Sequence, residues 1–206
     1  MHWAVFAQPD ADFYKSTARQ PTSGVGFRVG LNYSKPAVTS AVVVASPSTA
    51  TSYLGGVEPQ FGYYIGAYLY HDLRPNQFTF RLDATVQAQV ARAAYNGKTV
   101  ANPSYYYLGM TPLVGLHLTN NLTIYTGPEV NLQVARRGSW GKGYPLEVGV
   151  NMRFTYSFGR FGAEVGYFRG FTKIDRFELY NLPGGPAIND IYNQNMQAGI
   201  LYKLGR

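Results

Sequence analysis

Eight ionisable residues lie in stretches where polar and apolar residues alternate, and each occupies a position of the polar parity. Four are positive and four are negative: Arg28, Arg81, Asp83, Glu129, Glu147, Arg153, Glu164 and Lys203. If these side chains share one narrow interior, we expect them to form ion pairs, because burying an unpaired charge is energetically costly. The functional alternative is a selectivity filter or a proton path. We favour a packed charge network, because the interior of a small barrel is just filled by side chains.

Residues for other kinds of chemistry are sparse. The chain has no cysteine, which removes disulfides, thiolate metal sites and cysteine nucleophiles. Its three histidines are His2, His71 and His117. None of them lies in a stretch that we predict as a long loop, where a membrane-barrel hydrolase would place its base, and no pair has metal-ligand spacing. We therefore predict no enzymatic activity, no catalytic residue, no metal site and no cofactor.

The element that must position the charges is clearest at Gln77–Val90 (QFTFRLDATVQAQV). Apolar residues from Phe78 to Val90 fall on one parity, and polar residues, including Arg81 and Asp83, fall on the other. A strict period of two predicts a β-strand with one apolar and one polar face. The stretch is long enough to cross a bilayer, which takes about 9–11 tilted residues.

The same alternation predicts eight strands along the chain. They cover residues 24–34, 60–70, 77–90, 105–118, 122–134, 146–158, 161–171 and 192–204. The connections between them are alternately long and short, as in bacterial outer-membrane barrels with short periplasmic turns and longer surface loops. We predict an all-β, antiparallel, up-and-down transmembrane β-barrel of about eight strands with periplasmic termini. Ten strands would require a hairpin in loop 36–56 or in loop 172–190.

Composition agrees with this class. The 206 residues include 23 Gly, 18 Tyr and 12 Phe, with only 14% charged residues, which favours strands and turns over helices. The mean hydropathy is −0.17, and no run of about 18 apolar residues exists, which excludes a transmembrane helix. The net charge of +7 comes from scattered basic residues without a recognition helix, so nucleic acid is not an expected partner.

The N-terminal region carries a targeting pattern. Val5-Phe6-Ala7 places small residues where a signal peptidase cuts, so residues 1–7 are interpreted as the remnant of a signal peptide. The polar stretch 8–23 is then a periplasmic lead-in, and residues 24–206 form the barrel domain.

Two predicted surface loops carry candidate contact residues. Loop 135–144 contains Arg136, Arg137, Trp140 and Lys142, which suit a partner protein or the phosphates of lipopolysaccharide. Loop 172–190 is unusually apolar for a free loop, which is typical of a surface that covers the barrel mouth or docks on a neighbour. Its apolar residues are Phe177, Leu179, Tyr180, Leu182 and Ile188.

Several segments resemble one family of outer-membrane barrels. The stretch Tyr105–Val134 (YYYLGMTPLVGLHLTNNLTIYTGPEVNLQV) resembles the central hairpin of the PorT-like group common in Bacteroidetes. Val29-Gly30-Leu31-Asn32 resembles its first strand, and Gly199-Ile200-Leu201-Tyr202-Lys203-Leu204 resembles its last, although this chain ends in Leu-Gly-Arg rather than in an aromatic residue. The resemblance implies an outer-membrane barrel, and roles within that family vary.

These observations lead to one expected function and two alternatives. We expect a non-enzymatic protein of the bacterial outer membrane that acts as a structural or accessory subunit of a complex, with a plugged, charge-paired interior. Expected partners are membrane lipid, lipopolysaccharide and a neighbouring outer-membrane protein. The first alternative is a small, porin-like diffusion pore. The second is a soluble, lipocalin-like ligand carrier, in which the apolar parity would point inward.

Overall fold

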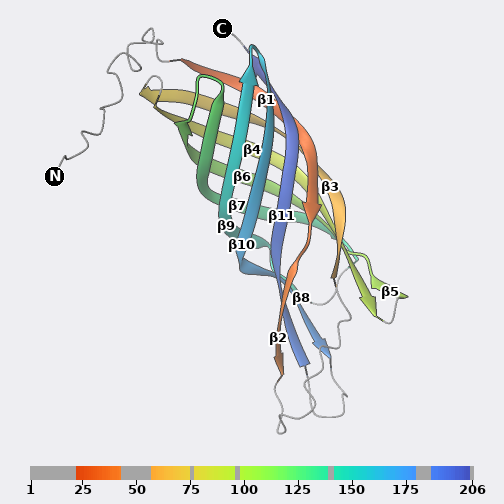
Figure 1. Cartoon of the computed structure of the whole chain (residues 1–206). Helices are drawn as coiled ribbons and strands as arrows, with labels where there is room; N and C mark the ends of the chain where they lie inside the picture. The colour runs from red at the N-terminus through yellow and green to blue at the C-terminus, as the bar shows by residue number, and fades with distance from the viewer. Residues whose placement is uncertain are drawn as a thin grey trace, which may run out of the picture.

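A computed structural model describes residues 22–42, 57–74, 77–95, 98–138, 142–179 and 187–204. The regular structure in these ranges is β-strand (Figure 1). The strands are β1 (Ser23–Ser34), β2 (Ala37–Val42), β3 (Val57–Arg74), β4 (Phe78–Tyr95), β5 (Lys98–Ala101), β6 (Ser104–His117), β7 (Leu122–Arg137), β8 (Lys142–Gly143), β9 (Leu146–Phe158), β10 (Phe161–Leu179) and β11 (Ala187–Leu204). Within the same ranges, no helix is long and apolar enough to span a membrane.

Eight long strands form a closed antiparallel ring. They follow one another in chain order as β1, β3, β4, β6, β7, β9, β10 and β11, and β11 pairs back with β1. The short strands β2, β5 and β8 add to β11, β4 and β10 rather than entering the ring. The predicted eight-stranded, up-and-down barrel is therefore confirmed, and the ten-stranded alternative is wrong.

The two ends of the barrel differ. Val25 of β1 pairs with Leu204 of β11, so the chain enters and leaves the barrel at one end, which we call the turn end (Figure 1). The close connections β6–β7 and β9–β10 also lie there. The second of these is a two-residue turn, in which Gly159 has a φ of 66°, a conformation that glycine adopts without steric cost. The longer connections lie at the opposite end, the loop end.

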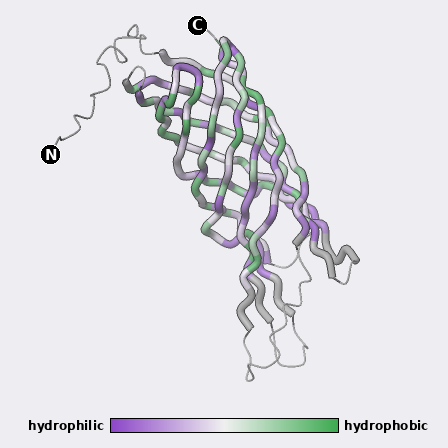
Figure 2. Tube along the Cα trace, in the orientation of Figure 1, coloured by the Kyte–Doolittle hydropathy of each residue, from purple (hydrophilic) through white to green (hydrophobic). Residues whose placement is uncertain are grey.

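Hydrophilic and hydrophobic residues alternate along the strands of the barrel (Figure 2). In β9, apolar residues from Val150 to Phe158 are 38% to 53% exposed, whereas the residues between them, from Asn151 to Thr155, are 0% to 4% exposed. The apolar parity therefore points outward and the polar parity inward. The soluble lipocalin-like alternative requires the opposite arrangement, so it is wrong.

The strands run further at the loop end than the sequence predicts. The predicted loop 172–190 is wrong for its described part, because β10 continues to Leu179 and β11 begins at Ala187. Two irregularities in the β10–β11 register, between Arg169 and Lys173 and between Lys173 and Asp175, explain the error. A β-bulge breaks the period of two, so the strand beyond it no longer shows the pattern used to find it.

Three other boundaries change for related reasons. The predicted loop 91–103 is partly wrong, because β4 reaches Tyr95 and folds back into β5. In the predicted loop 36–56, β2 continues the line of β1 along β11 after a break at Lys35 and Pro36. The predicted turn 71–76 begins later than expected, since β3 extends to Arg74. In each case, hydrogen bonds to a neighbouring strand maintain the β-structure beyond a residue at which the alternation in the sequence is interrupted.

Candidate functional site in the barrel interior

Asp83 is the centre of the interior charge cluster. Its carboxylate accepts hydrogen bonds from Arg81 through Nε at 2.6 Å and through Nη2 at 3.0 Å. Arg28 Nη1 donates to Asp83 Oδ2 at 2.7 Å, and Arg153 Nη1 contacts the same oxygen. Because β1, β4 and β9 each supply one arginine, the cluster ties distant parts of the ring together.

Glu164 on β10 closes the other side of the cluster. Its carboxylate lies 2.5 Å from Arg28 Nη2 and 3.2 Å from Arg81 Nη1. Tyr64 also donates to Glu164 Oε1 at 3.1 Å. The side chains of this group, Glu164, Arg28, Arg81 and Tyr64, are each 4% exposed or less. Charges so enclosed are stable only when their partners are well placed, and the geometry meets that condition.

Tyrosine rings support two of the guanidinium groups. Arg28 lies 4.4 Å above the Tyr64 ring, and Arg81 lies 4.4 Å above the Tyr68 ring. A Cβ atom at Gly30 or Gly199 would collide with Tyr64, so these two glycines leave the space that the ring fills. Tyr64 and Tyr68 are not among the predicted site residues, although they share the inward parity of β3.

Amide side chains bind the carboxylates nearer the loop end. Glu129 accepts hydrogen bonds from Asn131 at 3.0 Å, from Asn151 at 2.6 Å and from Gln87 at 3.3 Å, and it lies 3.5 Å from Arg153 Nη2. These amides also have the inward parity of their strands, but the predicted network contains charged residues alone and therefore lacks them.

Two of the eight predicted network residues lie outside the ion-pair cluster. Glu147 is fully buried and accepts a hydrogen bond from Asn131 at 3.0 Å, but within the described residues no cationic group lies within 4.0 Å of it. Lys203 lies at the turn end, 5.5 Å above the Tyr70 ring. The cluster consists of Arg28, Arg81 and Arg153 with Asp83, Glu129 and Glu164.

A buried layer of mainly apolar side chains lies in the interior near the loop end. It consists of Ala91, Tyr105, Tyr107, Ile174 and Ile191, each 0% to 2% exposed. The Tyr105 hydroxyl donates to Asp175 Oδ2 at 3.0 Å. Ile174 and Asp175 follow the irregular part of β10. This layer therefore depends on the extension of β10 into the predicted loop 172–190.

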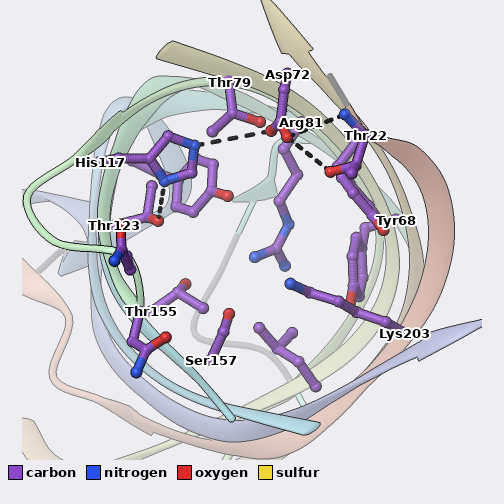
Figure 3. A pocket seen from close by; sticks show the side chains of 15 residues that line it. Thr22, Tyr68, Asp72, Thr79, Arg81, His117, Thr123, Thr155, Ser157 and Lys203 are labelled. Carbon is purple, nitrogen blue, oxygen red and sulfur yellow. Dashed lines mark hydrogen bonds and ion pairs between the residues drawn. The ribbon is translucent and has the colours of Figure 1, made fainter. Parts of the chain in front are cut away.

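A small pocket opens at the turn end (Figure 3). Asp72 on its wall accepts hydrogen bonds from the Thr22 hydroxyl at 2.7 Å and the Thr22 backbone N–H at 3.2 Å. Asp72 also lies 3.7 Å from His117 Nε2, and His117 Nδ1 lies 2.9 Å from the Thr123 hydroxyl. Asp72 thus ties the start of β1 to the end of β3. Across the described residues, no group of three or more His, Cys, Asp or Glu side chains could hold a metal ion.

The candidate contact residues fall in several places. Arg136 and Arg137 end β7, and Lys142 lies in β8, so the prediction of a loop is wrong for these residues. A register shift between Tyr106 and Tyr107 turns Arg136 toward β8, where its guanidinium packs against Gly143. Phe177 and Leu179 lie in β10 and Ile188 lies in β11, rather than in a loop. Trp140, Tyr180 and Leu182 lie outside the described residues.

Comparisons with known proteins add an architectural likeness. No family model and no curated protein sequence matches the chain. The outer membrane protein OprG of Pseudomonas aeruginosa is similar at 13% identity and a TM-score of 0.47, over 89% of this chain and 97% of that one. Ail of Yersinia pestis, in complex with the heparin analogue sucrose octasulfate, is similar at 8% identity and a TM-score of 0.47, over 88% and 99%. Strand pairing and burial within this chain define its class, a closed eight-stranded antiparallel β-barrel with an apolar exterior. The PorT-like resemblance stays a prediction.

Proposed function

We propose that this chain is an integral β-barrel of a bacterial outer membrane, without enzymatic activity, that serves as a structural or accessory subunit beside another protein. The observation that carries the proposal is the apolar outer face together with the buried charges inside. In water, an exterior of exposed Val, Leu, Ile and Phe side chains around a whole barrel is unfavourable, whereas in lipid it is the expected surface.

The height of the apolar outer surface supports the proposal that the barrel spans a membrane. Phe161 and Phe171 of β10 are 50% and 64% exposed, and ten residues of strand rise about 33 Å along the strand. At the usual strand tilt of about 40° this is about 25 Å along the barrel axis, close to the apolar band of outer-membrane barrels. At the turn end, the paired residues Phe27, Tyr202, Phe161 and Phe158 form an aromatic row. Such a row suits one membrane interface.

The asymmetry of the two ends supports an orientation. Short connections and both ends of the barrel domain suit the periplasm, and the extended strands suit the cell surface. Three exposed cations, Arg136, Arg137 and Lys142, lie near the loop end without an acidic partner among the described residues. Guanidinium and ammonium groups at that level suit the phosphates of lipopolysaccharide.

The packed interior supports a plug rather than a small diffusion pore. Three arginines and three carboxylates meet across the barrel, and the apolar layer at Tyr105 and Ile174 lies above them. Ion passage would require the cluster to open and hydrate. A role at the outer surface, where β2, β5 and β8 lengthen the wall beyond the ring, fits this closed interior better.

Native membranes provide the test of the proposal. Membranes from the natural host, separated on a density gradient, should place the protein in the outer-membrane fraction, and mild detergent should release it with a neighbouring protein. Replacing Arg136, Arg137 and Lys142 together by Gln should reduce copurified lipopolysaccharide. The same change at Arg160, which is exposed in the β9–β10 turn at the opposite end of the barrel, should not.

Two outcomes would contradict parts of the proposal. Recovery of the protein in the soluble fraction would remove the membrane assignment. If no neighbour copurifies at any detergent strength, and none is captured by crosslinking before extraction, the protein is a free-standing barrel and not a subunit.

A further inference from the structure

The turn-end pocket is a polar cavity inside the barrel, distinct from the surface that the proposed function uses. It has a volume of about 40 Å³ and is lined mainly by hydroxyl, amide and cationic side chains. A volume of this size holds about three water molecules. Figure 3 shows the Arg81 guanidinium and the Lys203 ammonium group directed into the same space, with Thr155 and Ser157 on the facing wall.

Hydrogen-bond donors are concentrated around this space. Arg81 carries five N–H donors, and only three of them are used in its hydrogen bonds to Asp83 and Glu164. Lys203 adds a second positive charge. The one carboxylate that lines the pocket is Asp72, which is already held by Thr22 and His117.

Two buried hydroxyl groups on the pocket wall have no hydrogen-bond partner among the residues that the structure describes. They belong to Tyr68, which is 3% exposed, and to Thr155, which is 4% exposed. A buried hydroxyl without a partner is rare in native proteins and points to a bound water or ion. Both groups are able to donate a hydrogen bond to an acceptor in the cavity.

We propose that this pocket binds a small inorganic oxyanion of the size of phosphate. An oxyanion with several acceptor oxygens satisfies the Thr155 and Tyr68 hydroxyls, and the spare Arg81 N–H groups and Lys203 supply charge-assisted hydrogen bonds. The cavity volume suits an anion that displaces a few waters and excludes most organic ligands. Access is from the turn end, so the inference does not depend on a partner at the loop end.

The test uses the folded, detergent-solubilised full chain and inorganic phosphate as the probe. We expect the melting temperature to rise by about 3–6 °C for each tenfold increase in phosphate above the dissociation constant. Sulfate should act similarly, whereas chloride at equal ionic strength should not. In Lys203→Met and in Thr155→Val the phosphate affinity should fall at least tenfold, and line broadening of the phosphate ³¹P resonance should decrease in parallel.

Matched substitutions outside the pocket separate binding from a general salt effect. Lys35→Met removes an exposed lysine at the loop end, and Thr126→Val removes an outward-facing threonine of β7. Both should keep the response of the wild type. Equal stabilisation by chloride, or an unchanged phosphate response in Lys203→Met or in Thr155→Val, whichever is folded, would overturn the proposal.

Discussion

Two glutamates on the inner wall differ in their surroundings, although both are fully buried. Glu164 contacts Arg28 and Arg81, whereas Glu147 accepts a hydrogen bond from Asn131 and has no cation within 4.0 Å among the described residues. Glu164→Gln leaves Arg28 and Arg81 to share the Asp83 carboxylate with Arg153, so we expect a loss of about 3–5 kcal/mol in the free energy of unfolding. Glu147→Gln keeps an acceptor for Asn131 and removes a buried charge, so its cost should stay below about 1 kcal/mol. Urea titration of the two variants in lipid vesicles compares them, and equal costs would show that both glutamates are paired alike.

Strand β9 allows the outward face to be tested at a chosen depth. Val150 lies in the middle of the apolar surface and Leu118 lies in the tight turn after β6, and both are exposed. Val150→Arg should cost about 2–4 kcal/mol in a bilayer, and Leu118→Arg should cost about 0–1 kcal/mol, because the penalty for arginine falls toward the membrane interface. Folding free energies measured in vesicles give the difference. Equal costs at the two depths would argue against a membrane around this barrel.

The packing of the barrel interior determines whether the protein can conduct ions. The Asp83 cluster lies across the interior, and the buried layer that includes Tyr107 and Ile174 lies nearer the loop end. Charges gain from pairing only where water is largely excluded, and the same exclusion blocks ions. In planar bilayers we therefore expect no steady conductance from folded wild-type protein. A reproducible open channel whose selectivity changes with Glu164→Gln would favour the diffusion pore.

The alternation of polar and apolar residues is sufficient to predict the eight strands of the ring and the direction of their side chains. In a regular strand, alternate residues lie on the same face, so a period of two assigns every residue to one of the two faces. For this reason Arg28, Asp83 and Arg153 were predicted inside, and Val86 and Val150 outside, as the structure has them. The order of short and long connections likewise follows directly from where the alternation stops.

Which interior groups contact one another depends on how the strands are aligned in the closed barrel. Glu147 and Glu164 have the same pattern around them in the sequence, yet the stagger between neighbouring strands brings only Glu164 to the arginines. The irregular part of β10 hides the extension to Leu179 for a similar reason, since a bulge cancels the period while hydrogen bonds to β11 maintain the strand. The turn-end pocket is decided in the same way. Its walls come from β3, β4, β6, β7, β9 and β11, and closure of the ring is what brings those residues to one space.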